Sequence, residues 1–452
     1  MNHIHSSTKE YDAIIVGAGF SGLYQLICLR DQLGLKCVVL ETGDDVGGTW
    51  YWNRYPGARC DTESHAYSYY FSDELLKEWT WSERYPGHEE IREYMNFVAS
   101  KFDLKKDILF KQKVTSAKFI EDSNNWNVKT DNNNFKCKFL ITAVGCLSNT
   151  NIPKIKGLEN FEGSYYHTGN WPKNGVSFVN KTVGQIGTGS TGIQAVPVIA
   201  AEAKHLTVFQ RTANYSIPAR NKPLTEKFKK QVKENFQYYK DLIKRTPNAH
   251  PFEISDRLVA DVNSEEMKHI YEKAWEKGGL QFRAAFNDLV TNFEANKTAS
   301  DFIKNKINET VLNKKFASIL SDIDHPYAGK RPPIDSNYFE TYNRDNVNLI
   351  DLRRDPIKCI NKNGIETEKN NFDLDIIVFA TGYDAMTGPL LNMNILGKNN
   401  LKLKNDWKEG PKTFLGLQIP GFPNLFTITG PGSPSVLTNM PMAIEQHVEW
   451  IR

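Results

Sequence analysis

The sequence predicts an α/β protein in which two nucleotide-binding units are joined and a helical segment is inserted into the second. Three observations lead to this fold class. A short apolar, β-branched run followed by a glycine-rich loop and a helical pattern occurs in residues 12–33 and again from residue 183 onward. Residues 223–321, in contrast, are rich in Lys and Glu with apolar residues at helical spacing, which predicts helices alone.

The first glycine-rich loop has the features of a dinucleotide site. Residues 12–16 (DAIIV) predict a strand that leads into GAGFSG, and the apolar periodicity of residues 23–33 predicts a helix. Gly17 suits the tight turn, and Gly19 lets backbone amides approach a pyrophosphate. Gly22 lets the helix pack on the strand with its N-terminus toward the anion. The pattern is typical of a Rossmann-like unit.

The same arrangement recurs in the second unit. Residues 183–186 predict a strand that runs into GTGSTG, where Gly187, Gly189 and Gly192 repeat the three glycine positions before another helical stretch. Gln185 is a local exception, because a strand before such a loop is usually apolar. Its side chain either forms a hydrogen bond at the edge of the sheet or is simply tolerated. The sequence therefore predicts two Rossmann-like dinucleotide-binding domains.

The two units differ in the residue that follows their second strand. Strand 36–40 ends at Glu41, and strand 206–209 is followed by Arg211; each stands nineteen residues after the last glycine of its loop. A carboxylate accepts hydrogen bonds from an unphosphorylated ribose, as in FAD or NAD, whereas a guanidinium suits the 2′-phosphate of NADPH. Arg211 as a solvated surface charge remains the alternative, because Arg is common on surfaces.

An acid-type and a base-type site in one chain indicate an electron path from NADPH to a flavin. Disulfide reductases also bind two nucleotides, but they need a redox-active cysteine pair. The six cysteines of this chain show neither a CxxC pair nor metal-ligand spacing. We therefore expect reduced thiols, no metal, and a reduced flavin that reacts with a small acceptor, of which O2 is the commonest.

Composition and charge argue against several other classes. The balance of 56 basic against 53 acidic residues gives a net charge of +3, which is too weak to indicate nucleic-acid binding. No stretch approaches the ~18 uninterrupted apolar residues of a membrane-spanning helix. Met1–Tyr11 lacks the apolar core of a secretory signal. We expect a cytoplasmic protein without nucleic-acid or membrane partners, and the oligomeric state stays open.

Two further segments point to the chemistry. Residues 47–61 (GGTWYWNRYPGARCD) begin with paired glycines, which allow the backbone to approach a flavin. Aromatic residues follow that could form the wall of a dry cavity, and Asp61 supplies a fixed negative charge inside it. By itself this segment would be an ordinary aromatic core with a Pro-Gly turn. Residues 161–172 (FEGSYYHTGNWP) fall at the join of the two units, where His167 is either an orienting group at a hinge or a structural histidine.

Both segments resemble the fingerprints of the Baeyer–Villiger monooxygenases. The likeness continues through residues 330–332 (KRP), 380–383 (ATGY) and 430–440 (GPGSPSVLTNM), and spans residues 11–452 without a large gap. It implies that NADPH reduces FAD, that O2 is captured as a C4a-peroxyflavin, and that this species converts a small-molecule ketone into an ester or lactone.

The resemblance also implies roles for single residues. Arg331 matches the catalytic arginine that stabilises the flavin peroxide, and Asp61 matches the carboxylate that positions this arginine. Arg211 and Lys330 match ligands of the NADP phosphate. The other implied cofactor contacts are Thr49, Trp50, Tyr51, Trp52, Arg59, Asp61, Tyr67, Val114 and Met440 in the flavin half, and Thr188, Gly189, Ser190, Thr191, Gly192, Gln194 and Thr212 in the NADPH half.

Two alternatives stay open at this point. One is a flavin monooxygenase that oxidises nitrogen or sulfur, whose linker motif generally lacks the terminal Trp171-Pro172. The other is a truncated FAD protein or NADPH oxidase that does not oxygenate a substrate. The latter is considered because the sequence ends at Arg452, whereas members of the family usually continue with a segment whose tryptophan closes over the nicotinamide.

The order of the motifs predicts the domain layout. We expect a discontinuous FAD-binding domain, residues 1–150 and 385–452, and an NADPH-binding domain, residues 151–222 and 322–384. The helical subdomain is expected at residues 223–321.

Overall fold

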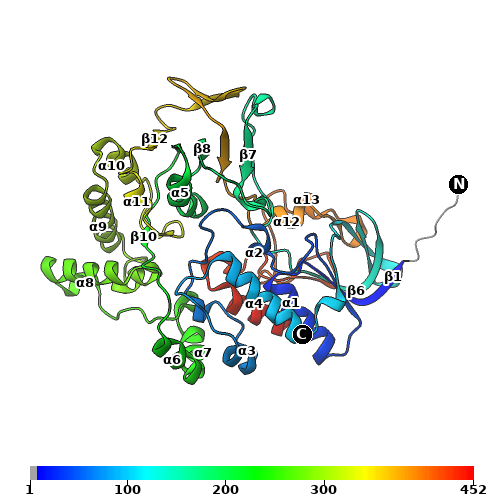
Figure 1. Cartoon of the computed structure of the whole chain (residues 1–452). Helices are drawn as coiled ribbons and strands as arrows, with labels where there is room; N and C mark the ends of the chain where they lie inside the picture. The colour runs from blue at the N-terminus through cyan, green and yellow to red at the C-terminus, as the bar shows by residue number, and fades with distance from the viewer. Residues whose placement is uncertain (1–7) are drawn as a thin grey trace.

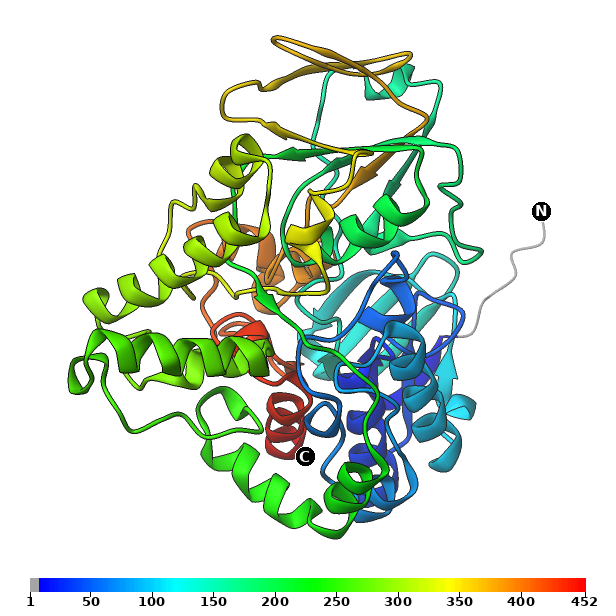
Figure 2. The same ribbon diagram turned by 60° about the vertical axis from the view of Figure 1, so that its left-hand side comes forward.

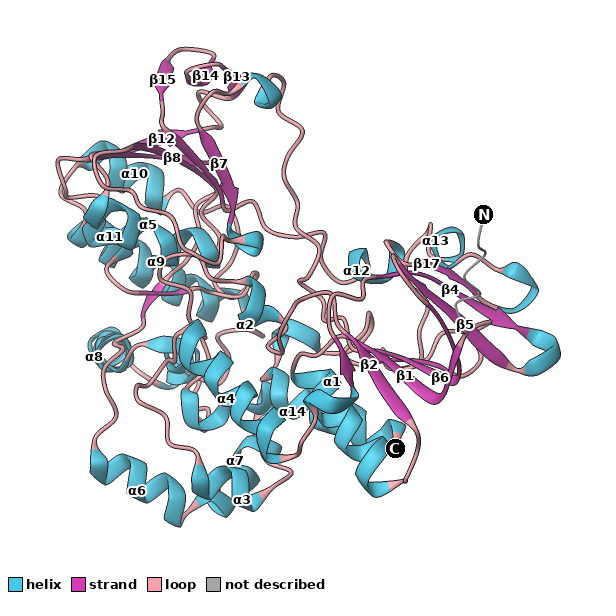
Figure 3. Ribbon diagram, turned by 45° about the vertical axis from the view of Figure 1, so that its right-hand side comes forward, coloured by secondary structure: helices cyan, strands magenta, loops and turns pink. Residues whose placement is uncertain are grey.

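The computed structural model describes residues 8–452, so most of the segment considered for a secretory signal lies outside the described residues. Two large β-sheets stand at separate ends of the molecule, with helices packed between and beside them (Figure 1, Figure 3). The structure is therefore α/β, as the sequence predicts. Within the described part of the chain, no helix has both the length and the apolar character that crossing a bilayer requires.

An eight-stranded sheet contains the first glycine loop. Its strands follow the order β17-β4-β5-β6-β1-β2-β3, and β18 pairs with the second half of β6. The pairs around β1 are parallel, whereas β4, β5 and β6 form antiparallel hairpins. The strands are β1 (Lys9–Val16), β2 (Cys37–Leu40), β3 (Ile108–Leu109), β4 (Val114–Ile120), β5 (Asn125–Thr130), β6 (Asn134–Thr142), β17 (Asn394–Leu396) and β18 (Leu425–Thr427).

Side chains of β1 alternate between two hydrophobic cores, one on each face of this sheet. Ala13 and Ile15 belong to the core that the helices cover, and Ile14 and Val16 to the core beneath the hairpins. The helices of this unit are α1 (Phe20–Leu26), α2 (Thr49–Trp52), α3 (Asp73–Glu78), α4 (His88–Lys101), α12 (Gly388–Leu391), α13 (Leu403–Asp406) and α14 (Met440–Ile451). Helix α1 continues as a π-helical segment, η1 (Ile27–Gln32), so the helix expected over 23–33 changes its geometry midway.

A five-stranded, wholly parallel sheet contains the second glycine loop. Its order is β12-β9-β8-β16-β7, and helix α5 (Ser190–Glu202) follows β8 directly. The strands are β7 (Ser164–His167), β8 (Thr182–Ile186), β9 (His205–Gln210), β12 (Val347–Asp351) and β16 (Ile376–Phe379). A three-stranded antiparallel sheet extends from this unit, formed by β13 (Ile357–Asn361), β14 (Gly364–Thr367) and β15 (Asn371–Asp373).

Five helices form the insert that the Lys/Glu-rich stretch predicts. Between residues 223 and 321 the structure contains helices and loops but no strand, and Figure 2 shows these green and yellow-green helices beside both units. A short parallel pair, β10 (Ile217–Pro218) with β11 (Ile334–Asp335), closes the base of the insert. The helices are α6 (Glu226–Glu234), α7 (Phe236–Arg245), α8 (Ser264–Lys277), α9 (Phe293–Thr310) and α10 (Lys314–Ser321), and the short α11 (Tyr338–Thr341) follows β11.

Candidate cofactor and active site

The first glycine loop is a cradle that admits no side chains at two positions. Gly17 has φ +106°, and a methyl carbon there would lie 2.6 Å from the carbonyl oxygen of Ala143. A methyl carbon at Gly22 would lie 1.8 Å from the oxygen of Gly17. Helix α1 begins after Gly19 without a side-chain cap, so its first amides and the positive end of its dipole are left for an anion. These features fit a dinucleotide pyrophosphate.

A second backbone segment covers this loop. The amide of Gly47 donates to the carbonyl of Ala18 over 3.1 Å. A methyl carbon at Gly48, which has φ +52°, would lie 2.8 Å from the Cα of Gly19. The paired glycines thus permit a close approach of the segment 47–61 to the loop itself. Together with buried Ala18, this contact makes the first loop an enclosed one.

Glu41 lies beneath the first loop with 5% of its surface exposed. Its carboxylate accepts a 2.7 Å hydrogen bond from the amide of Ala18 and a 2.6 Å hydrogen bond from the amide of Gly43. Burial raises the pKa of Glu41, and these backbone hydrogen bonds oppose that shift. A carboxylate has about four lone-pair sites, so acceptor capacity remains for ribose hydroxyls.

The second glycine loop has the same local geometry. Gly187 has φ +107°, and a methyl carbon there would lie 2.4 Å from the oxygen of Ala380. A methyl carbon at Gly192 would lie 2.3 Å from the oxygen of Gly187. Helix α5 begins after Gly189 without a side-chain cap, and Ser190, Thr191 and Gly192 form its first turn. Gly189 and Ser190 are exposed, and no atom of the described chain lies within 4 Å of a methyl position at Gly189.

Two exposed cations stand in connecting segments of this unit. Arg211 directly follows β9, and Lys330 lies in the loop before β11; neither forms a hydrogen bond or an ion pair with residues 8–452. Thr188 Oγ1 donates to the carbonyl of Thr212 over 3.1 Å, which joins the glycine loop to the backbone just after Arg211. An uncapped helix with unpaired cations fits a nucleotide that carries an additional phosphate.

Arg331 and Asp61 form a bidentate ion pair, although 270 positions separate them in the sequence. Arg331 Nε donates to one carboxylate oxygen over 2.6 Å and Nη2 to the other over 2.9 Å. Arg331 Nη1 also donates to the carbonyl of Val436 over 2.8 Å. The two side chains are about a quarter exposed, at 24% and 26%.

Electrostatics keep both members of this pair charged. Burial alone would raise the pKa of Asp61, but the Arg331 guanidinium outweighs burial and the pKa lies below its ordinary value. Burial would likewise lower the pKa of Arg331, and the charge of Asp61 raises it instead. The site therefore holds a fixed cation whose orientation is set by three hydrogen bonds.

His250 is a site neighbour for which the sequence gives no signal, because it lies in an irregular loop of the helical insert. It is 5% exposed, and its ring stacks on Phe252 with 4.9 Å between ring centroids. Burial and the positive charge of Arg331 lower the pKa of His250 to about 4, so this imidazole is neutral near pH 7. The loop is held in place by a 3.0 Å hydrogen bond from the amide of Asn439 to the carbonyl of Asn248.

The segment 47–61 also connects the two units. Tyr55 donates to Gln194 Oε1 over 2.7 Å, and Gln194 Nε2 donates to the carbonyl of Arg59 over 3.1 Å. Arg59 itself donates to Glu83 over 3.0 Å, so its guanidinium has a protein partner. Gln194 lies on α5, and this helix of the second unit is thereby fixed to the segment that carries Asp61.

Two of the aromatic residues predicted at the flavin, Trp50 and Tyr67, come together in the core on the helical face of the first sheet. Thr49, Trp50, Tyr51 and Trp52 make up α2, and Trp50 Nε1 donates to the hydroxyl of Tyr67 over 3.1 Å. The buried Val114 is the first residue of β4. Met440 is the first residue of α14, which packs against α1 and begins without a side-chain cap hydrogen bond.

The fingerprint at 161–172 includes β7, an edge strand of the second sheet. His167 is 4% exposed; its Nδ1 accepts a 3.0 Å hydrogen bond from the amide of Gly169, and its Nε2 has no partner in the described chain. A methyl carbon at Gly169 would lie 2.6 Å from the phenol of Tyr383. The hydroxyl of Tyr383 in turn donates to Asn53, so the fingerprint is linked to the segment 47–61. The hinge role of His167 remains a prediction.

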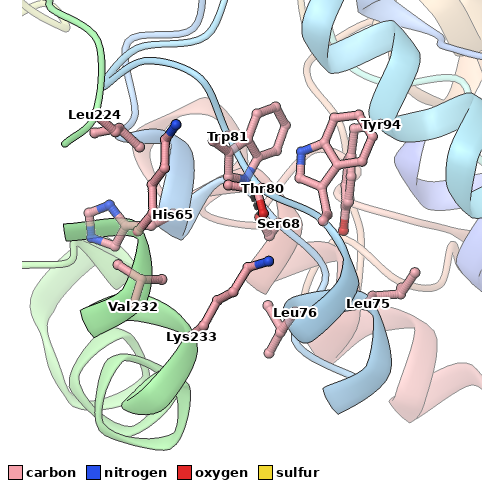
Figure 4. A pocket seen from close by; sticks show the side chains of 12 residues that line it. His65, Ser68, Leu75, Leu76, Thr80, Trp81, Tyr94, Leu224, Val232 and Lys233 are labelled. Carbon is pink, nitrogen blue, oxygen red and sulfur yellow. Dashed lines mark hydrogen bonds between the residues drawn. The ribbon is translucent and has the colours of Figure 1, made fainter. Parts of the chain in front are cut away.

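A cavity of about 40 Å³ lies apart from these residues, where α3, α4 and α6 meet (Figure 4). Its wall is mainly apolar and includes Trp79 and Val232, and a 3.0 Å hydrogen bond from Trp81 Nε1 to Ser68 Oγ crosses one side. None of the predicted site residues lines it. The described chain also contains no cluster of three His, Cys, Asp or Glu side chains that could hold a metal ion.

Comparison with known proteins agrees with this geometry. A family model described as flavin-binding monooxygenase-like matches residues 11–239. Cyclohexanone 1,2-monooxygenase from an Acinetobacter species is 45% identical over 452 residues, which cover 99% of this chain and 82% of that protein. A Baeyer–Villiger monooxygenase from Pseudooceanicola batsensis is 44% identical over 447 residues, which cover 98% of this chain and 81% of that protein.

The fold agrees equally well with solved structures. The crystal structure of a complex of OTEMO with FAD and NADP superimposes with a TM-score of 0.95 at 41% identity, and the match covers 98% of this chain and 85% of that one. Sequence and fold agree along nearly the whole described chain. The chain therefore belongs to the flavin-binding monooxygenase-like family and, within it, to the Baeyer–Villiger monooxygenases.

Proposed function

We propose that this protein uses NADPH and O2 to convert a ketone into an ester or lactone at the Arg331–Asp61 pair. FAD and NADP are its cofactors, and relatives at 44–45% identity are named for cyclohexanone or Baeyer–Villiger oxidation, whereas one at 41% is named a phenazine N-monooxygenase. When bound, the flavin supplies the activation of O2 and NADPH supplies the hydride. The observation that supports the assignment most strongly is the bidentate pair, because it fixes a cation next to the segment that covers the first glycine loop.

Arg331 has donors to spare for a reacting oxygen. Of its five N–H groups, one each on Nε, Nη1 and Nη2 is engaged by Asp61 or Val436, which leaves two for a negatively charged oxygen. A cation oriented in advance stabilises developing negative charge by about 3 kcal/mol per donor in comparable oxyanion sites. Asp61 acts as a positioning residue here, because its low pKa keeps the carboxylate ionised and the guanidinium in place.

The aromatic residues around α2 exclude water from this side of the site. Trp50 and Tyr55 are at least nine-tenths buried, and Tyr67 closes the cluster through its bond to the Trp50 indole. A water-poor pocket strengthens the electrostatic effect of Arg331 and limits unproductive reaction of the activated oxygen with solvent. We also propose that the residues implied by the resemblance as cofactor contacts bind FAD or NADP, because of where the fold places them.

The strand order supports the proposed domain layout. The first sheet takes its strands from residues 9–142 and 394–427, and the second from residues 164–379. This division agrees with a discontinuous FAD-binding domain around an inserted NADPH-binding domain. We further propose a cytoplasmic location, in line with six cysteines, all within the described residues, that form no disulfide.

The test is a product analysis of the purified holoenzyme with NADPH, O2 and a panel of cyclic ketones, linear ketones, a tertiary amine and a thioether. We expect esters or lactones carrying one added oxygen atom, with little hydrogen peroxide released. N-oxide or sulfoxide as the only oxygenated product would favour the heteroatom-oxidising alternative. NADPH consumption that yields only peroxide would favour the oxidase.

A variant tests the role of Arg331 separately from cofactor binding. Arg331→Ala should be reduced by NADPH under anaerobic conditions at nearly the wild-type rate, yet form no ester, because only the oxygenation needs the cation. Arg353→Ala, which removes an arginine paired with Asp322 and Asp351 elsewhere in the second unit, is the matched control. Ester formation by Arg331→Ala at the normal rate would refute the assignment.

A further inference from the structure

Gln185 joins the two ends of the second glycine loop from below. It is fully buried in β8, two positions before Gly187. Its Nε2 donates to the carbonyl of Gly187 over 3.1 Å and to the carbonyl of Gly192, also over 3.1 Å. Gly187 and Gly192 are the first and the last glycine of the loop, so one amide group spans the turn that precedes α5.

The first glycine loop has an apolar residue at the corresponding place. Ile15 stands two positions before Gly17 and is fully buried. A methyl carbon at Gly22 would lie 3.6 Å from Ile15 Cγ2, and a methyl carbon at Gly192 would lie 3.0 Å from Gln185 Nε2. The two side chains therefore support their loops from the same position, the first by packing and the second by hydrogen bonds.

The surroundings explain why the second loop needs such support. The first loop is covered by Gly47 and Gly48, whereas Gly189 has no atom of the described chain within 4 Å of its methyl position. The segment 47–61 forms its hydrogen bonds to α5 only further along, at Gln194, so the exposed turn itself depends on contacts from within its own unit. The only side-chain hydrogen bonds to its glycines, among residues 8–452, are the two from Gln185.

Folding stability alone does not account for a glutamine at this position. The carbonyl oxygen of its side chain, Oε1, is buried without a hydrogen-bond partner in the described chain. A buried acceptor without a partner is costly, and an apolar residue such as the isoleucine of the first loop would avoid that cost. A residue that departs from the local rule in this way is expected to serve a functional site.

We propose that Gln185 is a positioning residue for NADP: it fixes the separation of the Gly187 and Gly192 carbonyls, and so orients the amides of the exposed loop toward the nucleotide phosphates. The inference rests on the proposed function, since it takes the second loop as the NADP site. Removing the two hydrogen bonds should leave the loop in place but less ordered. The affinity for NADP should therefore fall, while the overall fold is kept.

The test compares Gln185→Ile, which introduces the residue of the first loop, with Gln185→Met, which keeps the length but has no donor. The dissociation constant of NADP+ is measured by titration of the FAD-loaded protein without turnover. We expect it to rise roughly tenfold, the effect of losing two neutral hydrogen bonds. FAD content should stay at the wild-type value, any fall in the thermal midpoint should be no larger than that of Gln210→Leu, and hydrogen exchange at the amides of residues 187–192 should accelerate.

Gln210→Leu is the matched control. Gln210 is a second buried glutamine, on the neighbouring strand β9, and its Nε2 donates to a single backbone carbonyl, that of Ile319, over 3.1 Å. Its replacement should lower the thermal midpoint without changing the NADP+ dissociation constant.

The outcomes separate the two proposals. If the wild-type protein does not bind NADP+, the proposed function fails first. If it does, and the Gln185 variants bind NADP+ with unchanged affinity and unchanged exchange, the positioning role is refuted. Failure of both variants to fold with FAD would also refute it, because Gln185 would then be required for the fold.

Discussion

The two glycine loops of this protein have the same local geometry but differ in what surrounds them. In each, a methyl group on the last glycine would collide with the oxygen of the first, and an uncapped helix follows. The first loop is enclosed by Gly47 and Gly48, whereas Gly189 and Ser190 of the second loop are exposed. From this difference we expect a nucleotide at the first loop to be retained through many turnovers and one at the second loop to exchange in each cycle.

The residues expected at the two riboses differ in the same way as the loops: one is enclosed and the other is exposed. Glu41 is buried and bonded to backbone amides, and Arg211 is exposed without a protein partner among residues 8–452. A buried carboxylate is shielded from salt, whereas an exposed guanidinium acts through a screened interaction. The difference teaches that one sequence motif can support either a resident or an exchanging nucleotide, according to the segments that pack over it. Four changes test this.

The largest effect is expected from Gly22→Ala in the enclosed loop. The new methyl carbon would lie 1.8 Å from the oxygen of Gly17, a backbone atom that cannot move without displacing α1. We expect the free energy of unfolding to fall by more than about 4 kcal/mol and the FAD to be lost. Flavin absorbance per chain and denaturant unfolding measure both quantities. A Gly22→Ala protein that retains a full complement of FAD would contradict the geometry of the enclosed loop.

The next effect concerns Glu445, a buried acid on α14, the helix that packs against α1. Its carboxylate accepts hydrogen bonds from the amides of Tyr70 and Phe71, and burial raises its pKa to about 7. Because the folded-state pKa lies above the ordinary value of 4.5, the stability from this group is full below pH 4.5 and is lost as the pH rises through 7.

Glu445→Gln removes this pH dependence. From pH 5 to pH 9, the variant should gain roughly 3 kcal/mol of unfolding free energy relative to wild type, as the shift in pKa implies. Denaturant unfolding at a series of pH values measures the difference. Glu449→Gln, one turn later on the exposed side of α14, serves as the control and should parallel wild type. An unchanged pH profile for Glu445→Gln would show that the acid ionises freely in the folded protein.

A smaller effect is expected at the open loop from Arg211→Ala. Removal of the guanidinium should lower the preference for NADPH over NADH by roughly 10- to 50-fold, since charge-assisted hydrogen bonds to a phosphate are lost. The ratio of kcat/KM for the two coenzymes, measured at two salt concentrations, reports this preference. Lys204→Ala removes an equal charge at the opposite end of β9 and should leave the ratio unchanged. If both variants keep the wild-type ratio, Arg211 is a solvated surface charge.

The smallest effect is expected from Gly189→Ala, the open-loop counterpart of Gly22→Ala. Its methyl group meets no atom of the described chain within 4 Å, and the backbone φ of −79° suits alanine. The free energy of unfolding should therefore stay within about 0.5 kcal/mol of the wild-type value. The FAD content per chain should equal that of the wild type. The dissociation constant of NADP+ should rise a few-fold because the methyl group projects into space that the phosphates need. Loss of FAD from this variant would show that the two loops are not independent.

The sequence predicted those features that depend on residues close together in the chain. Strand, glycine loop and helix follow one another within about 20 residues, so both loops could be placed from their pattern. The pairing of Arg331 with Asp61 joins distant segments, and no local pattern indicates it; the family resemblance alone implied it. Gln185 stood out as an exception, but its contacts with two glycine carbonyls required the folded loop. His250 gave no signal at all.

The pairing of β18 with β6 has a consequence for how the protein is made. One edge of β6 is shared, with Asn134–Cys137 pairing with β5 and Leu140–Thr142 pairing with Leu425–Thr427. During translation this half of the edge stays open until residues 425–427 have left the ribosome. The five strands of the other sheet all lie between residues 164 and 379 and can assemble earlier. The nascent chain can therefore complete the five-stranded sheet before the eight-stranded sheet.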